Sequence, residues 1–306
     1  KKILQFFPQK NWKKEFYYAK KYNFNFIEYF GERKFNKHNP IWNKKSLLQI
    51  NKLVKKNKLS NYSFCDNFFI NKNFINFLDF DKYYSTLIEN LSIINIKLYV
   101  LPLIGKSLIT KKNLSDFVPR LQYLANKLKY KKVKLALELD LNPKSISKLL
   151  KQINIKNVFI VYDTGNRLEK KKSQYNEIIK LKKYICHFHL KDKNLKGDNV
   201  ILGSGKVNFE SIFKAIKSNK YKGKYTFETN RGKEPKKTMF ENKNFILDII
   251  KKNSELIFYK IVLPPSTTIV DPFMYDDSLE AKKSTALLYS FFFAILFNVI
   301  NFFNLL

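Results

Sequence analysis

The feature that most constrains the fold of this chain is a regular alternation of short apolar runs with amphipathic segments. The apolar runs are rich in β-branched and aromatic residues, as are strands that are buried on both faces. They span residues 24–30, 62–66, 97–103, 134–140, 157–163, 184–190 and 224–230. Between them, apolar residues recur at three- and four-residue steps, a spacing that predicts helices. These segments span residues 11–22, 46–57, 114–130, 145–154, 175–184 and 209–218.

One strand and one helix together repeat at about 30 residues, which is typical of a (β/α)8 TIM barrel. The first predicted helix precedes all seven predicted strands, so a closed barrel needs one strand more. The opening run KKILQFF is a poor strand, and we therefore expect a barrel that lacks its first strand.

The strand and helix pattern ends near Asn253, which predicts a barrel domain over residues 1–253. Residues 254–285 are expected to be a linker or an unrelated segment, so the chain ends in a non-barrel tail. Residues 286–306 carry no charge and are long enough to cross a bilayer. This apolar run is interpreted either as a membrane anchor or as a non-native C-terminus.

The formal net charge of +33 raises the question of a nucleic-acid partner. The lysines, however, are spread along the whole chain and accompany many Asn, Ile, Phe and Tyr residues, whose codons are also rich in A and T. Biased composition therefore explains the charge, and no nucleic acid is expected as a partner. Cys65 and Cys186 lie far apart without a C-x-x-C spacing, and the opening residues lack a secretory signal. A cytoplasmic protein is predicted, tethered to a membrane only through the apolar tail.

Four predicted strands carry an ionisable side chain near their C-terminal ends, where the active site of a TIM barrel lies. In chain order these side chains are Glu138, Asp163, His189 and Glu228. Burying each one alone in an apolar run would cost several kcal/mol, and a shared divalent metal would offset that cost. The donor set favours one Mn²⁺ or Mg²⁺ ion, with Zn²⁺ or Co²⁺ also compatible. Asp163 is followed by Thr164-Gly165-Asn166, so it also suits a turn.

The run ICHFHLKD holds two of the three histidines in the chain. His187 and His189 are two residues apart, so on a strand both side chains point into the barrel. His189 is nearer the strand end and is the predicted ligand, whereas His187 is either a neighbour of the metal site or a core residue. Cys186 and Phe188 are expected to face the surrounding helices. Lys191 follows at the barrel mouth, where its charge could neutralise an oxyanion or a phosphate.

Five segments in this order resemble the sugar phosphate isomerase/epimerase family, the xylose isomerase-like barrels. They are LALELDLNP, VFIVYDTGN, CHFHLKD, LGSGKVNFESIFKAI and YKGKYTFETNRG. The resemblance runs from about Ile3 to about Asn253 and implies the same four metal ligands. The chain departs from the family at Ser204, where relatives usually have Glu. It also departs at Asn166, where some epimerases place a substrate-contacting His.

The resemblance implies an enzyme that isomerises or epimerises a sugar or sugar phosphate by removing a proton next to a carbonyl, through an enediolate. Glu138 and Glu228 are the predicted acid/base pair. Glu28, His187, Lys191 and Arg231 are the predicted substrate-binding residues. An inosose-type dehydratase on the same metal site and an inactive truncated barrel stay open as alternatives. A DNA-repair endonuclease of this superfamily would need more histidines than three. Homo-oligomerisation stays open.

Overall fold

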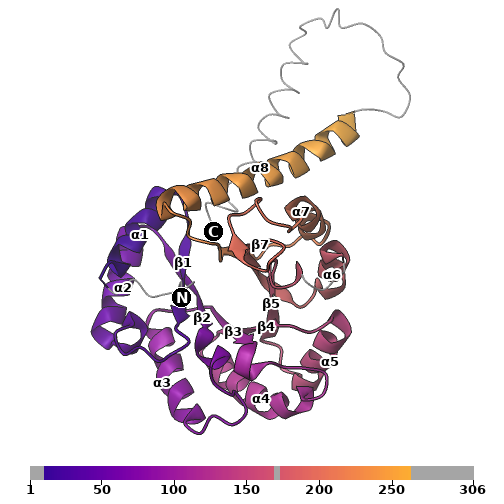
Figure 1. Ribbon diagram of the computed structural model, residues 1–306. Coiled ribbons are helices and arrows are strands. Elements are labelled where there is room, and N and C mark those ends of the chain that lie inside the picture. Colours follow the sequence, from indigo (N-terminus) through magenta and orange to yellow (C-terminus); the bar gives the residue numbers. More distant parts are fainter. Residues whose placement is uncertain (1–9, 169–172, 263–306) are drawn as a thin grey trace, which may run out of the picture.

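Seven parallel strands wrap into a nearly closed barrel in the computed structural model, which describes residues 10–168 and 173–262 (Figure 1). The strands follow one another around the barrel in the order β1-β2-β3-β4-β5-β6-β9. They are β1 Phe26–Gly31, β2 Ser60–Asp66, β3 Leu98–Leu103, β4 Lys134–Leu139, β5 Val158–Asp163, β6 Ile185–Leu190 and β9 Lys224–Phe227. A short antiparallel pair, β7 Asp192–Lys193 and β8 Asn199–Val200, follows β6.

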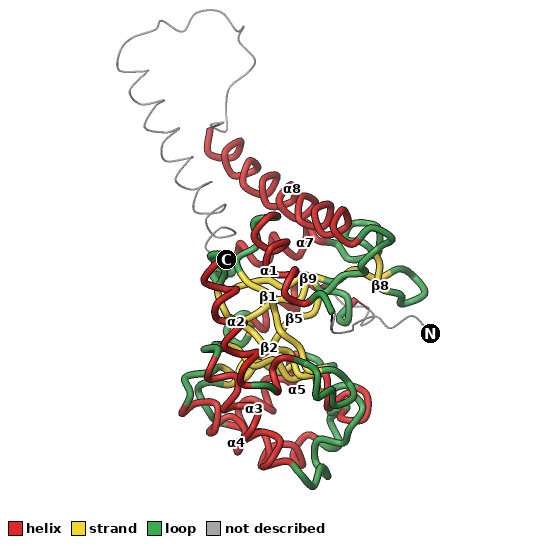
Figure 2. The backbone as a smooth tube through the Cα atoms, turned by 90° about the vertical axis from the view of Figure 1, so that its left-hand side faces the viewer, coloured by secondary structure: helices red, strands yellow, loops and turns green. Residues whose placement is uncertain are grey.

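The helices surround the strands, and the long α8 crosses one side of the barrel (Figures 1 and 2). They are α1 Trp12–Lys21, α2 Lys44–Lys56, α3 Phe80–Ile93, α4 Leu114–Tyr130, α5 Pro143–Ile153, α6 Gln174–Leu181, α7 Phe209–Ser218 and α8 Pro235–Val262. Three short 3₁₀ turns, η1 Pro40–Trp42, η2 Asn67–Ile70 and η3 Gly105–Ser107, lie in the loops. The alternation of strands and helices predicted from the sequence is confirmed.

Four helices begin at a polar side chain that accepts a hydrogen bond from a backbone N–H of the first turn, the arrangement of an N-cap. This explains why α2, α5, α6 and α7 start where they do. The capping residues are Asn43, Asn142, Ser173 and Asn208, whose side chains accept from the N–H groups of Ser46, Ser145, Asn176 and Ser211.

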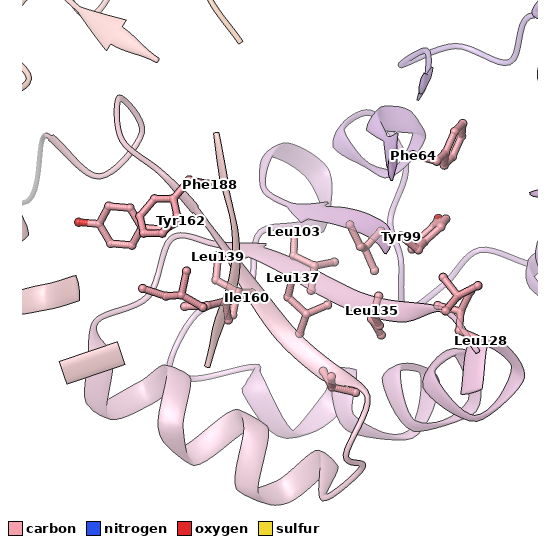
Figure 3. Close-up of a cluster of buried hydrophobic side chains, with 14 of the residues drawn as sticks. Phe64, Tyr99, Leu103, Leu128, Leu135, Leu137, Leu139, Ile160, Tyr162 and Phe188 are labelled. Carbon is pink, nitrogen blue, oxygen red and sulfur yellow. The ribbon is translucent and has the colours of Figure 1, made fainter. Parts of the chain in front are cut away.

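Alternate residues of each strand face two different apolar layers. Leu135, Leu137 and Leu139 of β4 point to the larger layer between the strands and the helices, part of which is shown in Figure 3. Ala136 of β4 packs in the smaller layer inside the barrel, where it meets Val161 of β5 and residues of β2 and β3. Glu138 continues the inward face of β4, because strand residues alternate with a period of two. The barrel interior is therefore apolar below and polar at its C-terminal mouth.

The pairing of β5 with β6 contains a register shift. Ile160 pairs with Ile185, whereas Val161 pairs with His187, so that Cys186 is the extra residue of a bulge. Cys186 packs against the apolar layer inside the barrel. The expectation that it faces the helices was wrong, because the bulge breaks the alternation at this residue. Phe188 lies in the outer layer as predicted.

Strands β1 and β9 are the two edges of the described sheet, and no ladder joins them among the described residues. Side chains bridge this seam instead: the ring centroids of Phe24 and Phe227 lie 5.7 Å apart. Lys243 Nζ of α8 donates to the carbonyls of Tyr22 and Asn23, at 2.7 and 3.0 Å. The last helix thereby ties the end of the barrel to its beginning, and the predicted seven-stranded barrel is confirmed.

The predicted boundary at Asn253 falls inside α8, which continues to Val262. The predicted apolar tail lies outside the described residues, as do residues 1–9, so its interpretation stays a prediction. Among the described helices, none combines the length and the apolar character that crossing a bilayer requires.

Candidate metal centre

The four ionisable side chains predicted at the strand ends meet in one cluster at the mouth of the barrel. Because parallel strands end at the same rim of the barrel, the ends of β4, β5, β6 and β9 are neighbours. One ligand atom from each of the four residues lies within 4.8 Å of the others. They are Glu138 of β4, Asp163 of β5, His189 of β6 and Glu228, which follows β9 directly.

The cluster opens into a cavity of about 1040 Å³ at the barrel mouth. Glu138, Glu228, Asn166 and Lys191 all line this cavity. A volume of this size accommodates a small organic molecule. The cluster is therefore buried in the protein but accessible to a ligand from the mouth.

Two nitrogen donors connect the three carboxylates of the cluster. Lys191 Nζ lies 2.6 Å from Asp163 Oδ2 and 3.0 Å from Glu228 Oε2. Asn166 Nδ2 donates to Glu138 Oε1 at 2.7 Å and to Asp163 Oδ2 at 3.1 Å. The lysine was predicted at the mouth as a partner for a substrate anion, but its side chain is only 6% exposed and pairs with two carboxylates of the protein.

Asp163 serves its own loop as well as the cluster. Its Oδ1 accepts hydrogen bonds from the backbone N–H groups of Gly165 and Asn166, at 2.9 and 2.8 Å. Its Oδ2 faces Lys191 and Asn166. One oxygen therefore forms the turn that the sequence DTGN suggested, while the other remains directed into the cluster.

The charges of the cluster follow from burial and from neighbouring charges. Burial, together with the charge of Asp163, raises the pKa of Glu138 to about 7. Burial also opposes ionisation of Glu228, but the charges of Lys191 and His189 outweigh it and hold the pKa of this carboxyl well below its usual range. Burial disfavours the charged form of His189, yet the facing carboxylates of Glu28 and Glu228 raise its pKa.

The residues present fit a divalent cation. His189 Nδ1 points into the cluster, 3.1 Å from Glu228 Oε2 and 3.8 Å from Glu138 Oε2. Both ring nitrogens of His189 are buried, and neither makes an aligned hydrogen bond within the described chain. A buried nitrogen left without such a partner is costly, and a metal ion would satisfy it. Three carboxylates and one imidazole are ligands that Mn²⁺, Mg²⁺, Zn²⁺ and Co²⁺ accept.

The predicted substrate-binding residues lie at different depths. Glu28 of β1 lines the cavity and faces His189 and His187 with its carboxylate. His187 is fully buried beneath the cluster, with its Nε2 2.8 Å from Thr226 Oγ1, and burial lowers its pKa to about 3, so the ring is neutral. Arg231 lines the cavity but lies outside the metal cluster, on the exposed rim beyond β9.

The buried ion pair of Arg167 and Glu177 was not predicted from the sequence. Arg167 donates to the carbonyls of Leu139 and Leu141 and pairs with Glu177 of α6. It thereby joins the loop after β4 to the loop after β5. The sequence signal was available, because Arg167 follows the DTGN turn directly, but a single arginine in a basic chain does not stand out.

Asp192 organises the loop that follows β6. Its carboxylate accepts hydrogen bonds from the backbone N–H groups of Gly203, Gly205 and Val207, at 2.9 to 3.0 Å. A side chain on Gly205 would meet this carboxylate at 2.2 Å, which explains the glycine. The Ser204 hydroxyl donates to the carbonyl of Ile201. The LGSGKV segment is thus a loop wrapped around one buried carboxylate.

Comparison with protein families gives one match that covers most of the chain. A sequence model described as xylose isomerase-like TIM barrel matches residues 16–249. No curated protein matches the chain by sequence.

Solved structures with the same fold include D-psicose 3-epimerase from Clostridium cellulolyticum H10, determined with D-tagatose. It has a TM-score of 0.65 at 15% identity, over 78% of this chain and 93% of its own. The 3-keto-D-glucoside 4-epimerase of E. coli has a TM-score of 0.64 at 16% identity, over 79% and 96%. The IOLI protein, solved with a bound zinc atom, has a TM-score of 0.63 at 17% identity, over 78% and 93%. At these identities the likeness is one of fold.

Proposed function

The chain belongs to the xylose isomerase-like TIM barrel family, and from this premise we propose that it is a divalent-metal-dependent isomerase or epimerase of a sugar or sugar phosphate. One observation carries the proposal: three carboxylates and one imidazole converge within 4.8 Å beside a cavity that Glu138 and Glu228 line. The fold shared with two sugar epimerases supports the substrate class.

Glu138, Asp163, His189 and Glu228 are the proposed metal ligands. When bound, a divalent metal supplies the positive charge that stabilises an enediolate. The zinc atom in one structure of the same fold supports a divalent ion as cofactor. The oxygen-rich donor set favours Mn²⁺ or Mg²⁺.

Glu138 and Glu228 are the proposed acid/base pair. They approach His189 from two different strands, so each could exchange a proton with a different face of a bound sugar. In the metal-free protein, burial and the charge of Asp163 raise the pKa of Glu138 to about 7, whereas Lys191 and His189 hold Glu228 ionised. Epimerisation at the carbon next to a carbonyl needs both groups, and aldose–ketose isomerisation can use one.

Lys191 and Arg231 are the proposed positive groups for substrate oxygens, since both line the cavity. Glu28 lines it too and could accept a hydrogen bond from a sugar hydroxyl. Among the described residues that line the cavity, Thr226 and Glu28 contact His187, which is not one of them. Its contact with substrate is therefore proposed to be indirect.

Deuterium wash-in tests this proposal. The Mn²⁺-loaded protein is incubated in D₂O with a panel of ketoses and ketose phosphates, and exchange at the carbon next to the carbonyl is followed by NMR. We expect exchange with at least one sugar, and a loss of about 10²–10⁴-fold in Glu138→Gln and in Glu228→Gln. Asp66→Asn is the control, because Asp66 is a buried carboxylate that does not line the cavity.

Exchange that persists in both glutamine variants would contradict the proposed acid/base pair. Absence of exchange with every sugar, in a protein that binds metal, would contradict the isomerase and epimerase assignment. Screening the same panel for loss of water would then test the dehydratase alternative, which uses the same ligands. A protein that neither exchanges nor dehydrates any substrate would match the inactive barrel.

A further inference from the structure

The two ring nitrogens of His189 face different carboxylates. Nδ1 points to Glu228 and Glu138, as described above. Nε2 lies on the opposite side of the ring, 3.0 Å from Glu28 Oε1. A neutral imidazole has one N–H and one lone pair, so it can offer a lone pair to a metal at one nitrogen only. The group that holds the proton therefore decides which nitrogen binds the metal.

Glu28 is well placed to hold that proton. It extends from β1, the edge strand that meets β9 at the seam of the barrel, and its side chain is only 8% exposed. The rings of Phe26 and Tyr62 pack against the neighbouring His187, at 6.4 and 5.7 Å between centroids. Among the contacts of the described residues, Glu28 Oε1 is the acceptor closest to Nε2 of His189.

We propose that Glu28 is a positioning residue: it accepts the Nε2–H of His189 and thereby presents the Nδ1 lone pair to the metal. This inference rests on the proposed function, because it requires His189 to be a ligand. A carboxylate behind a metal-binding imidazole sets both the tautomer and the ring orientation. Glu28 would then act on the reaction through His189, whether or not it also touches the substrate.

The same three residues offer a second arrangement, because ligand atoms of Glu28, His187 and His189 also lie within 4.8 Å of one another. Two facts favour the positioning role over a second metal ion at this place. The His187 nitrogen that faces Glu28 already contacts Thr226 Oγ1 at 2.8 Å and lies 3.7 Å from Glu28 Oε2. A neutral His189 that gives its Nδ1 lone pair to an ion in the metal cluster, moreover, has no second lone pair for another ion.

Nitrogen NMR of the histidine rings tests the inference directly on the unaltered protein. The chain has three histidines, so selective ¹⁵N-histidine labelling gives three ring systems, and His38→Gln removes one for assignment. In the protein loaded with diamagnetic Zn²⁺, we expect His189 to carry its proton on Nε2 and the metal on Nδ1. Ligation through Nε2, or a proton on Nδ1, would overturn the inference.

Metal affinity gives the second readout. Glu28→Leu removes the acceptor, and we expect Zn²⁺ to bind about 10–100-fold more weakly, as for other partners behind a ligand. Glu28→Gln keeps an acceptor oxygen and should lose less. Thr226→Val is the matched control, because it alters the neighbour of His187 and leaves the Glu28–His189 contact in place. Circular dichroism checks that each variant is folded, and the NMR result on the unaltered protein stands if a variant is not.

The outcomes separate this inference from the proposed function. A protein that binds no divalent metal overturns both. One metal per chain, with unchanged affinity in Glu28→Leu, overturns only the role of Glu28. Two metals per chain, one of which is lost in Glu28→Gln, would make Glu28 a ligand and overturn its positioning role. One metal, weakened in Glu28→Leu with the expected tautomer, supports both.

Discussion

One isolated carboxylate and one cluster of carboxylates lie at the strand ends of this barrel, and the two are stabilised in opposite ways. Asp66, at the end of β2, is surrounded by neutral donors: Tyr83 Oη at 3.0 and 3.1 Å, the hydroxyl of Tyr99, and the backbone N–H of Phe68 at 3.1 Å. It is fully buried and does not line the cavity. Every hydrogen-bonding need of this carboxylate is met inside the protein.

The metal cluster at the ends of β4, β5, β6 and β9 contains three carboxylates, which Lys191 and His189 balance with charge. It lines a cavity, and a ring nitrogen of His189 is left without an aligned hydrogen bond in the described chain. The difference teaches how to tell a structural carboxylate from a functional one. The structural carboxylate, Asp66, accepts hydrogen bonds from neutral donors only. The functional carboxylates are paired with charged groups and lie beside a polar atom that a ligand can bind.

The largest expected effect comes from removing the ammonium of the metal cluster. Lys191→Met leaves Asp163 and Glu228 buried without their cation, and we expect the metal-free protein to lose about 3–5 kcal/mol of unfolding free energy. Urea denaturation measures this loss. A cost below about 1 kcal/mol would show that the cluster does not depend on charge balance and would remove the contrast with Asp66.

The pH dependence of the unfolding free energy should reveal the raised pKa of Asp66. Burial raises its pKa from the usual 3.8 to about 6, so between these values the folded state binds more protons than the unfolded chain. Unfolding free energy should therefore fall as pH rises through this window, by about 3 kcal/mol. Asp66→Asn should remove that fall, measured as the difference between the two urea-denaturation profiles from pH 4 to 7. Parallel profiles would contradict the assignment.

Metal binding should stabilise the folded protein through the metal cluster, and this gain should not depend on Asp66. Mn²⁺ at about 100 times its dissociation constant is expected to add about 2.7 kcal/mol to the unfolding free energy. Asp163→Asn, which removes a proposed ligand charge, should abolish most of this gain, whereas Asp66→Asn should keep it. Thermal unfolding with and without Mn²⁺ measures the gain. An equal loss in both variants would mean that Asp66 and the metal cluster do not differ in function.

The smallest expected effect is the loss of one donor to Asp66. Tyr83→Phe keeps the ring and removes its hydroxyl, and we expect a cost of about 1.5 kcal/mol because Tyr99 and the N–H of Phe68 remain. With one donor fewer, the pKa of Asp66 should rise further. The fall of unfolding free energy that Asp66 causes should therefore extend to a higher pH. Tyr130→Phe, an exposed tyrosine, is the control and should leave stability unchanged.

Much of the fold was predictable because each strand and helix carries its own pattern. The helices predicted over 114–130 and 209–218 coincide with α4 and α7, and the strand over 134–140 exceeds β4 by one residue. Helix α3 was not among the predicted segments. Its buried residues Phe80, Tyr84, Leu87 and Leu91 nevertheless recur at four- and three-residue steps, so the sequence signal was available.

The candidate site was predictable to the level of which residues end the strands. The spacing of Glu138, Asp163, His189 and Glu228 follows from the repeat, because parallel strands end at one rim. Their partners did not follow from it. Lys191 pairs with Asp163 across 28 positions of the chain, a partner that the strand spacing did not indicate. Asp66 ends its strand just as Glu138 does, and only its tyrosine neighbours assign it to the core.

The sequence by itself therefore determined the barrel, its seven strands and the four residues at the mouth, since these depend on local periodicity and on the geometry of parallel strands. The tertiary structure decided which side chain faces which. A bulge turned Cys186 inward, and the curvature of the barrel brought Glu28 of the first strand to the far side of His189. Contacts of this kind join residues that are distant in the chain, and no local pattern records them.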